Sequence, residues 1–343
     1  MSFKRLDTED FILSADSITA PLWTTNSPTL TIFFTSSTQE AATSGDYYLS
    51  VYQTGSALSG SEVQFDIAYG NKLGSGSALY NTLVPENSPT KTIYGQYRAL
   101  VLGDENANFV FGSVTASDFW ALSISRNRYK ESLFPGSLTL KLVGSAGVIS
   151  LTDDSQYTTS NIFTDAGRIY NLISGSAGVK TTSAYTTTNG WSLNSGSYGW
   201  FLPDIGTIIL NPLALGGSVI QGGISLTPNR SNNSDGLNNR ILYNAISGST
   251  AKTFILNSQE TVTSDYVFIR ARNSEFNYSE NPTFISGSTG EVLYDDFINN
   301  PQVYFTTVGM YNDNNELLAV AKLSKPLIKD FTKEALIRIK LDF

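Results

Sequence analysis

Short runs of β-branched and aromatic residues recur along the chain, separated by turns of Gly, Ser and Asn. In residues 30–35 and 47–52, apolar and polar side chains tend to alternate. Successive side chains on a strand point to opposite faces, so this alternation predicts strands with one face buried and one in water. The same pattern predicts further strands at residues 63–68, 119–124, 138–143, 207–210, 252–256, 266–272, 303–311 and 317–323.

The turns between these runs share one composition. Ser-Gly-Ser or Gly-Ser units occur at residues 59–61, 74–77, 174–176, 195–197, 247–249 and 286–288. Glycine reaches positive φ at low cost, and serine hydrogen-bonds its own backbone, so these units indicate tight turns. We therefore predict a mainly β fold of antiparallel, sandwich-like sheets with a few short helices.

The clearest predicted helix runs from Pro89 to Leu102. Ser88 stands at its N-cap, Pro89 at its first position and Gly103 after its end. Its apolar face is expected to comprise Ile93, Tyr97, Leu100 and Val101. Shorter helices are predicted at residues 237–246 and 290–299.

Domain boundaries are weakly marked in the sequence. Residues 153–160 and 181–197 are rich in Thr, Ser and Asn, which places a division near residue 150. We expect a β-rich domain over 1–150, with the helix near 89–102, and a β-rich domain over 151–343 that ends in a hairpin and a terminal strand.

Composition narrows the chemistry. The 343 residues contain no cysteine and no histidine, which removes thiolate chemistry and the usual general base near neutral pH. The net charge of −8 argues against a nucleic-acid partner, because phosphate binding needs clustered cations. No apolar run approaches the roughly 20 residues of a membrane span. We expect no enzyme activity, no catalytic residue, no cofactor and no metal.

Three adjacent acid pairs are the remaining candidates for chemistry. They are Asp104-Glu105, Asp153-Asp154 and Asp295-Asp296. Neighbouring side chains diverge on a strand or a helix, so adjacency does not make a working pair, and we interpret these residues as solvated turn or helix-surface acids. A glycosidase pair assembled from distant segments stays open.

Two other segments have both a functional and a structural interpretation. Residues 311–316 carry oxygen ligands suited to calcium, but they lie between two alternating apolar runs and lack a glycine, which favours an Asx-rich hairpin turn. Trp191, Tyr198, Trp200 and Phe201 could stack on sugar rings, fill a core or anchor a subunit contact.

The C-terminal third carries a resemblance. Residues 272–282 read RNSEFNYSENP, residues 308–322 read VGMYNDNNELLAVAK, and the closing run 334–343 reads EALIRIKLDF. These segments resemble virion proteins of myoviruses, in particular cyanophages: the hairpin is similar to segments of baseplate and tail-collar proteins, and the closing run to terminal strands of baseplate wedge subunits. Residues 95–112 share the likeness more faintly.

The resemblance implies an assembly role without catalysis. We expect a tail baseplate component, made in the cytoplasm of an infected bacterium, that is oligomeric in the virion and contacts other tail subunits. The terminal strand is expected to pair within a sheet. A neck or head-decoration protein and a receptor- or carbohydrate-binding tail module are the alternatives.

Overall fold

The computed structural model describes residues 5–23, 48–53, 62–77, 88–158, 162–181, 189–192, 194–231, 237–248, 254–278 and 281–342. These residues form two compact units. Unit 1 comprises residues 1–17 and 261–343, and unit 2 comprises residues 18–260. This division differs from the expected boundary, because residue 150 lies inside strand β9 of the main sheet of unit 2. The strand expected at 30–35 lies outside the described residues.

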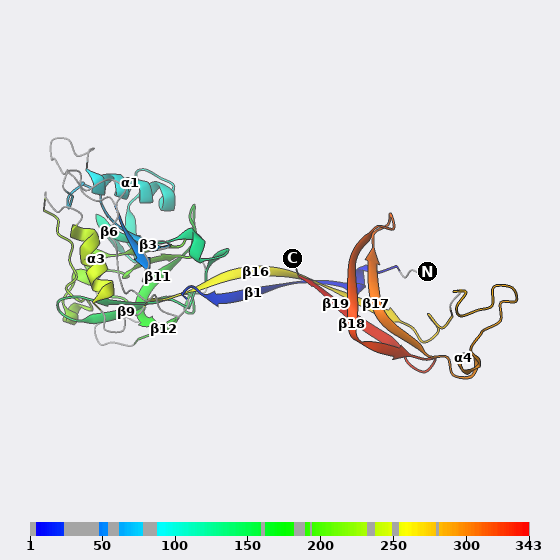
Figure 1. Cartoon of the computed structure of the whole chain (residues 1–343). Helices are drawn as coiled ribbons and strands as arrows, with labels where there is room; N and C mark the ends of the chain where they lie inside the picture. Colours follow the sequence, from blue (N-terminus) through cyan, green and yellow to red (C-terminus); the bar gives the residue numbers. More distant parts are fainter. Residues whose placement is uncertain are drawn as a thin grey trace. The chain divides into compact units, whose positions relative to one another are not determined.

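Unit 2 is built on an eleven-stranded sheet whose pairs are antiparallel (Figure 1). Its main path runs β15-β8-β9-β11-β13-β14-β6-β3-β2, and β10 and β12 pair with β11. The bounds are β2 Tyr48–Gln53, β3 Glu62–Asn71, β6 Asp118–Ile124, β8 Thr139–Val143, β9 Val148–Asp153, β10 Ile162–Thr164, β11 Gly167–Ser176, β12 Val179–Lys180, β13 Gly199–Leu202, β14 Thr207–Leu210 and β15 Phe254–Ile255. The mainly β prediction is confirmed.

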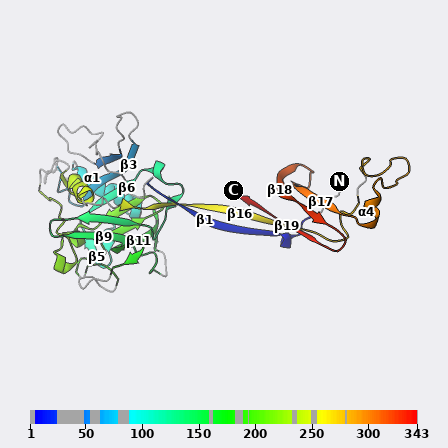
Figure 2. The ribbon, with the colours of Figure 1, turned by 60° about the horizontal axis from the view of Figure 1, so that its bottom comes forward.

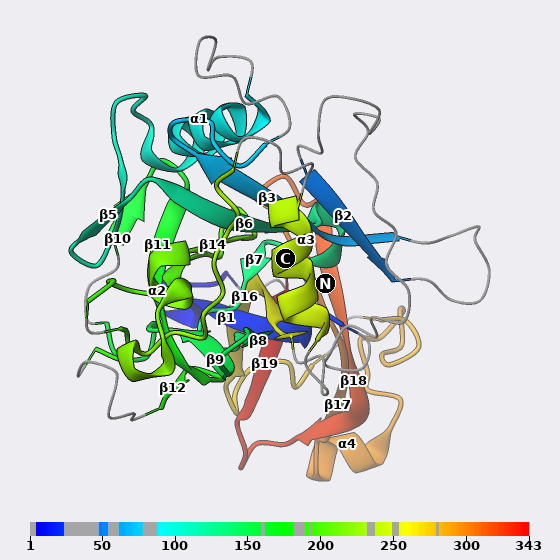
Figure 3. The ribbon, with the colours of Figure 1, turned by 90° about the vertical axis from the view of Figure 1, so that its left-hand side faces the viewer.

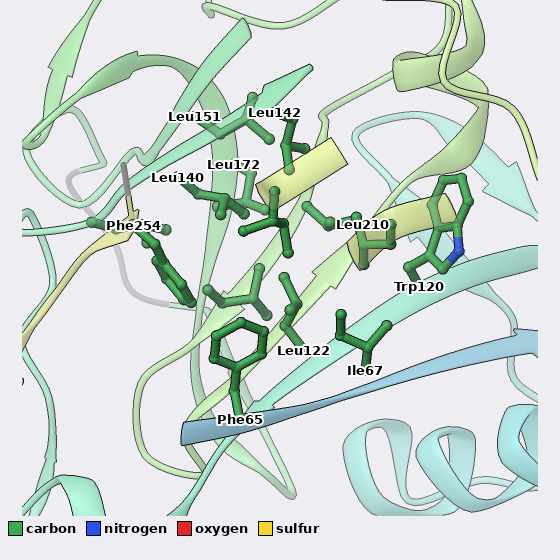
Figure 4. Close-up of a cluster of buried hydrophobic side chains, with 14 of the residues drawn as sticks. Phe65, Ile67, Trp120, Leu122, Leu140, Leu142, Leu151, Leu172, Leu210 and Phe254 are labelled. Carbon is green, nitrogen blue, oxygen red and sulfur yellow. The ribbon is translucent and has the colours of Figure 1, made fainter. Parts of the chain in front are cut away.

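The sheet curls until its distant strands face each other across a core. Phe65 of β3 and Phe254 of β15 pack edge to face with centroids 5.4 Å apart, although six strands separate them in the sheet order. Figure 4 shows leucines of β8, β9 and β11 meeting Phe65, Ile67 and Leu122 in this core. The curled sheet therefore has the two facing layers of a sandwich.

Central strands bury both faces. In β6, Trp120 and Leu122 enter the core inside the curl, whereas Phe119 and Ala121 enter a second core on the other side. This follows from the two-residue period of a strand. A strand that is buried on both sides carries a near-continuous apolar run, and in β6 this run is residues 119–122.

The described part of unit 2 also contains three α-helices (Figure 3). They are α1 Pro89–Leu102, α2 Pro212–Gly216 and α3 Leu237–Ser247. Helix α3 lies against β3 and β8, and its Asn238 carbonyl accepts a hydrogen bond from Trp120 Nε1 at 2.9 Å. Helix α1 lies against β3 and contributes to the second core. The remaining elements of unit 2 are η3 Arg126–Arg128, η4 Val219–Gln221, β7 Ser132–Leu133 and the pair β4 Phe109–Phe111 and β5 Val114–Ala116.

The predicted bounds of helix α1 are confirmed, but one residue of its predicted apolar face is exposed. Gly103 closes the helix at φ 63°, and its N–H donates to the Ala99 carbonyl. The buried side chains include Ile93, Tyr94 and Val101, whereas Leu100 is exposed. Leu100 lies away from the stripe that α1 turns toward β3 and the second core.

Unit 1 contains a three-stranded path, a hairpin and a short helix (Figure 2). Strand β16, Asn257–Ala271, lies between β1, Phe11–Pro21, and β19, Ala335–Asp342. Strands β1 and β16 both continue into unit 2. There β16 also pairs with β7. Strands β17, Val303–Tyr311, and β18, Leu317–Lys329, form the hairpin. The other elements are η1 Thr8–Asp10 and α4 Asp295–Asn299. The predicted pairing of the terminal strand is confirmed by the register of Asp342 with Ser264.

The helix predicted over 290–299 forms only in its last five residues. Gly290 has φ +70°, and Val292 forms an isolated bridge with Ile285. Both features hold the chain out of the helical region until Asp295. Among the described residues, no helix is both long enough and apolar enough to span a bilayer.

Candidate assembly surface

The turn of the β17–β18 hairpin is held by Asn312. Its Oδ1 accepts the backbone N–H groups of Asn314 at 3.0 Å and Glu316 at 2.8 Å, and its Nδ2 donates to Glu316 Oε2 at 2.6 Å. Asn315 adopts φ 63°, a conformation that Asn tolerates better than most residues. The oxygens of residues 311–316 thus close the turn on itself, as the hairpin interpretation predicted.

One face of the hairpin packs on the sheet. Val267 of β16 and Ile337 and Ile339 of β19 are buried beneath it. Partly buried side chains of the hairpin cover them: Phe305, Val308, Met310, Ala321, Leu323 and Leu327. In the described part of unit 1, the buried hydrophobic side chains are Val267, Ile337 and Ile339, together with two alanines. Its core is therefore small.

The other face of the hairpin exposes apolar side chains in cross-strand pairs. Tyr304, 61% exposed, lies opposite Ile328, and Tyr311 lies opposite Leu317. Val320, 58% exposed, lies opposite Gly309. We call these five side chains, with Leu318 beside them, the outer hairpin face. The Thr307–Lys322 pair lies between the Tyr304–Ile328 pair and the Gly309–Val320 pair, so the apolar side chains stand in two groups. Exposed apolar groups rimmed by polar residues are typical of contact surfaces with other chains.

The three-stranded path presents a different outer face. Arg338 and Lys340 of β19 lie over the ring of Tyr266, at 5.6 and 6.0 Å from its centroid. Arg270 pairs with Glu334, and Lys340 Nζ lies 2.9 Å from Asp342 Oδ1. The hydrogen bond with Asp342 raises the pKa of Lys340. This face combines an aromatic ring with charges, whereas the outer hairpin face is largely apolar.

A buried lysine ties the loop after β16 to the hairpin. Lys329 ends β18, and its Nζ donates to the Asn273 carbonyl at 3.0 Å and to Asn277 Oδ1 at 2.7 Å. Burial lowers the pKa of this ammonium, while the carboxylates of Glu275 and Asp330 act in the opposite direction. Phe276, at φ 59°, packs edge to face on Phe305. The segment that carries the RNSEFNYSENP motif is thus anchored to β17 and β18.

The acid pairs lie in separate environments. Asp104-Glu105 is exposed in a turn after α1, and Asp295-Asp296 opens α4 on the surface. Asp153 is buried: its carboxylate accepts the N–H groups of Gly136 and Ser155. Burial raises the pKa of Asp153 and of Asp154. The interpretation as solvated acids is therefore wrong for Asp153, which organises a turn from inside the protein.

The aromatic residues proposed to stack on sugars do not form one exposed platform. Tyr198 and Phe201 are fully buried, and the Tyr198 hydroxyl donates to the Gly222 carbonyl at 2.5 Å. Burial raises the pKa of Tyr198 to about 12. Trp200 packs on Phe109 and Phe111, and Trp191 packs against the main core. Core filling accounts for the cluster.

Sequence reasoning missed a buried polar group in unit 2. The Asp118 carboxylate accepts hydrogen bonds from the Tyr69 hydroxyl and from Arg230 Nε, each at 2.7 Å. Burial, followed by the charge of Asp118, raises the pKa of Tyr69. Arg230 stands 112 residues after Asp118, so no local pattern could have joined them. Among the described residues, no cluster of three acids could hold a metal ion.

Comparison with known proteins found no relative of this chain. No family model matches it, nor does any curated protein or solved structure.

Proposed function

We propose that this chain is a non-catalytic structural subunit of a virus particle, in the tail baseplate of a contractile-tailed phage, and that it acts through contacts between subunits. The observation that carries the proposal is the exposure of apolar side chains over a unit with a small core. Among its described residues, unit 1 leaves the outer hairpin face uncovered while only three of the larger hydrophobic side chains are buried. Contact with another subunit would supply the missing apolar burial.

The segments that resemble baseplate proteins coincide with this surface. Residues 308–322 form most of the hairpin, and residues 335–342 form β19 beneath it. Residues 272–278, the described start of the third segment, form the loop that Lys329 holds. The three stronger segments thus fall in one structural unit, which is the expected result if that unit performs the shared role, while the fainter likeness of residues 95–112 lies in unit 2.

The deciding experiment is quantitative mass spectrometry of purified particles and of tails detached from heads. We expect this chain in the tails, at a low multiple of six copies, because a baseplate has six-fold symmetry. Enrichment in heads at high copy number would instead support a decoration protein. Absence from the particles would overturn the proposal.

A surface test separates assembly from glycan binding. Tyr304→Ser together with Val320→Ser should remove the chain from assembled tails while leaving the fold intact, because both side chains are exposed. Leu73→Ser, at an exposed position of unit 2, is the matched control and should assemble normally. If the double variant assembles normally but loses binding to host glycans, the surface is a receptor site instead.

A further inference from the structure

The loop after β16 holds a lysine amine against an asparagine carboxamide. Lys329 ends β18, and it is fully buried. Its Nζ lies 2.7 Å from Asn277 Oδ1. Because an amide C=O bond is about 1.2 Å long, Nζ stands at most roughly 4 Å from the carbonyl carbon Cγ of Asn277. Atoms poised to react stand about 3–3.5 Å apart, so little movement separates this amine from that carbon.

Hydrogen bonds at both ends fix the orientation of the Asn277 carboxamide. Its Nδ2 donates to the Asn273 carbonyl at 2.7 Å, and its Oδ1 accepts from Lys329 Nζ. The same Asn273 carbonyl accepts from Lys329 Nζ at 3.0 Å. One backbone oxygen thus holds both side chains, and this alignment removes most of the entropy cost of bringing two groups together.

Burial also makes the Lys329 amine a better nucleophile. Desolvation lowers the pKa of Lys329, while the charges of Glu275 and, more weakly, Asp330 act to raise it. A lower pKa leaves more of the side chain as the neutral amine, which is the form that attacks a carbonyl carbon. Hydrogen bonds from Thr332 lower the pKa of Asp330, which makes that carboxylate a weaker base. Glu275 is therefore the carboxylate suited to exchange a proton with Lys329.

Phe276 holds the segment that carries Glu275 and Asn277. Its backbone has φ 59°, a value that is rare for a bulky residue. Its ring packs edge to face on Phe305 of β17, with centroids 5.8 Å apart. Sparsely populated backbone conformations persist where the surrounding contacts impose them, and they concentrate at functional sites.

We propose that Lys329 and Asn277 join in an isopeptide bond within the chain. The neutral Nζ attacks Cγ of Asn277, a C–N bond forms, and the electron pair of the carbonyl moves to Oδ1. Glu275 takes a proton from Nζ and gives it to Nδ2. The electron pair then returns from Oδ1, the Cγ–Nδ2 bond breaks, and ammonia leaves. An amine and a primary amide thus become a secondary amide and ammonia, with no oxidant, metal or other reactant.

The bond supplies a covalent closure to a unit with a small core. It joins two residues 52 positions apart, and the ring between them contains α4 and the β17–β18 hairpin. The chain has no cysteine, so a disulfide cannot serve this purpose. A cross-link stabilises a fold by restricting the unfolded chain. The reaction occurs once in each chain and does not depend on the proposed function.

Mass spectrometry of the purified full chain tests the bond. Once the state of the initiator methionine is allowed for, we expect an intact mass below the sequence mass by one molecule of ammonia. Trypsin should not cut after Lys329 and does not cut between Lys325 and Pro326, so residues 273–322 should appear joined to residues 323–333. An intact mass equal to the sequence mass would overturn the proposal. Loss of ammonia from a linear peptide would also overturn it, because that product is an asparagine cyclised on its own backbone.

Matched variants identify the two reacting side chains. Lys329→Met removes the amine and Asn277→Ala removes the carboxamide, so both chains should have their full sequence mass. Asn273→Ala keeps the backbone carbonyl, and Lys333→Met changes an exposed lysine, so both should still form the bond. A bond in Lys329→Met or Asn277→Ala would contradict the assignment. The wild-type digest locates the bond by itself, so the proposal is decided even if a variant at the buried position does not fold.

The rate of bond formation tests the proton transfer. Glu275→Gln keeps an acceptor for the Arg272 N–H but removes the carboxylate. We expect the linear chain to disappear about 100-fold more slowly after a pulse of expression, and Glu275→Asp to recover part of the rate. Equal rates in Glu275→Gln and the wild type would overturn the role of Glu275.

Discussion

Two glycines of helix α1 have opposite roles. Gly95 lies inside the helix, and a Cβ added there meets nothing within 4 Å. Gly103 ends the helix at φ 63°, and a Cβ there would overlap the Asp165 carboxylate. Glycine at position 95 loses more backbone entropy on folding than alanine would, and no contact requires it there. Position 103 requires glycine because its backbone is left-handed.

We therefore expect Gly95→Ala to raise the free energy of unfolding by about 0.5–1 kcal/mol. Gly103→Ala should lower it, because alanine strains the left-handed backbone and displaces Asp165. Urea titrations of the two variants and the wild type measure both effects. A loss of stability in Gly95→Ala would show that the helix interior is crowded in solution.

Two aspartates of unit 2, the buried Asp153 and the partly exposed Asp204, respond to pH with opposite sign. Burial raises the pKa of Asp153, and its hydrogen bonds with Ser155 and Gly136 oppose that shift only in part. Burial also acts to raise the pKa of Asp204, but hydrogen bonds and charge from Arg168 outweigh it and lower that pKa. Arg168 reaches Asp204 Oδ1 through Nε at 3.0 Å and Nη2 at 2.5 Å.

The signs follow from proton linkage. Asp153 binds its proton more tightly in the folded state, so its contribution is greatest below the unfolded pKa of about 3.9 and is lost as pH rises through the folded pKa. Asp204 contributes above about pH 3.9, and this contribution is lost as pH falls through its lower folded pKa. The stability of the wild type relative to Asp153→Asn should therefore fall as pH rises, and relative to Asp204→Asn it should grow.

Denaturant titrations of the three proteins across the acid range test this pair. Subtraction of each variant from the wild type cancels the other titrating groups, provided that the fold is unchanged. Curves of the same sign for both variants would contradict the assigned environments.

At the scale of elements, the β17–β18 turn depends on one side chain. Asn312→Ala removes the acceptor for the N–H groups of Asn314 and Glu316, which should cost about 1 kcal/mol. We expect faster amide hydrogen exchange near the tip of the hairpin. Asp313→Ala, at the exposed neighbouring position, is the matched control and should leave exchange in β17 and β18 unchanged.

Local chemistry made several elements predictable. Pro89 and Gly103 mark the two ends of α1, and alternation together with an Asx turn marks the hairpin. These signals act within a few residues. The helix expected from residue 290 was shortened by the Val292 bridge with Ile285, a pairing that periodicity does not reveal.

Contacts between distant segments could not be predicted from the sequence in the same way. Nothing near Phe65 indicates that it meets Phe254, and nothing near Lys329 indicates that it binds the carbonyl of Asn273. Strand order decides which edges stay open, and strand order depends on long-range pairing. The candidate surface could thus be predicted as a hairpin and a terminal strand, but not as two open edges with an uncovered face.

At the scale of the whole molecule, the two units differ in how much they bury. Unit 2 holds two large buried clusters, whereas unit 1 buries Val267, Ile337 and Ile339. Stability grows with buried apolar area, so unit 1 alone should unfold at a lower temperature than unit 2. Association with other copies would raise the stability of unit 1 by mass action.

Calorimetry of two core variants tests this picture. Ile337→Ala and Leu122→Ala each remove a buried side chain, at a typical cost of about 2–5 kcal/mol. We expect two transitions, the lower shifted only by Ile337→Ala and the upper only by Leu122→Ala. If both variants shift one common transition, then β1 and β16, which continue from one unit into the other, couple the units into a single cooperative fold.

The dependence of the two transitions on protein concentration shows whether unit 1 associates with a second copy. A transition that involves release of a second copy moves to higher temperature as the protein is concentrated, because the folded and associated state is favoured by mass action. If the outer hairpin face of one copy packs on a second copy, the unit 1 transition should rise with concentration and the unit 2 transition should stay fixed. Tyr304→Ser together with Val320→Ser should abolish this dependence while retaining both transitions. A unit 1 transition that is independent of concentration in the wild type would mean that its apolar surface is covered by a different protein.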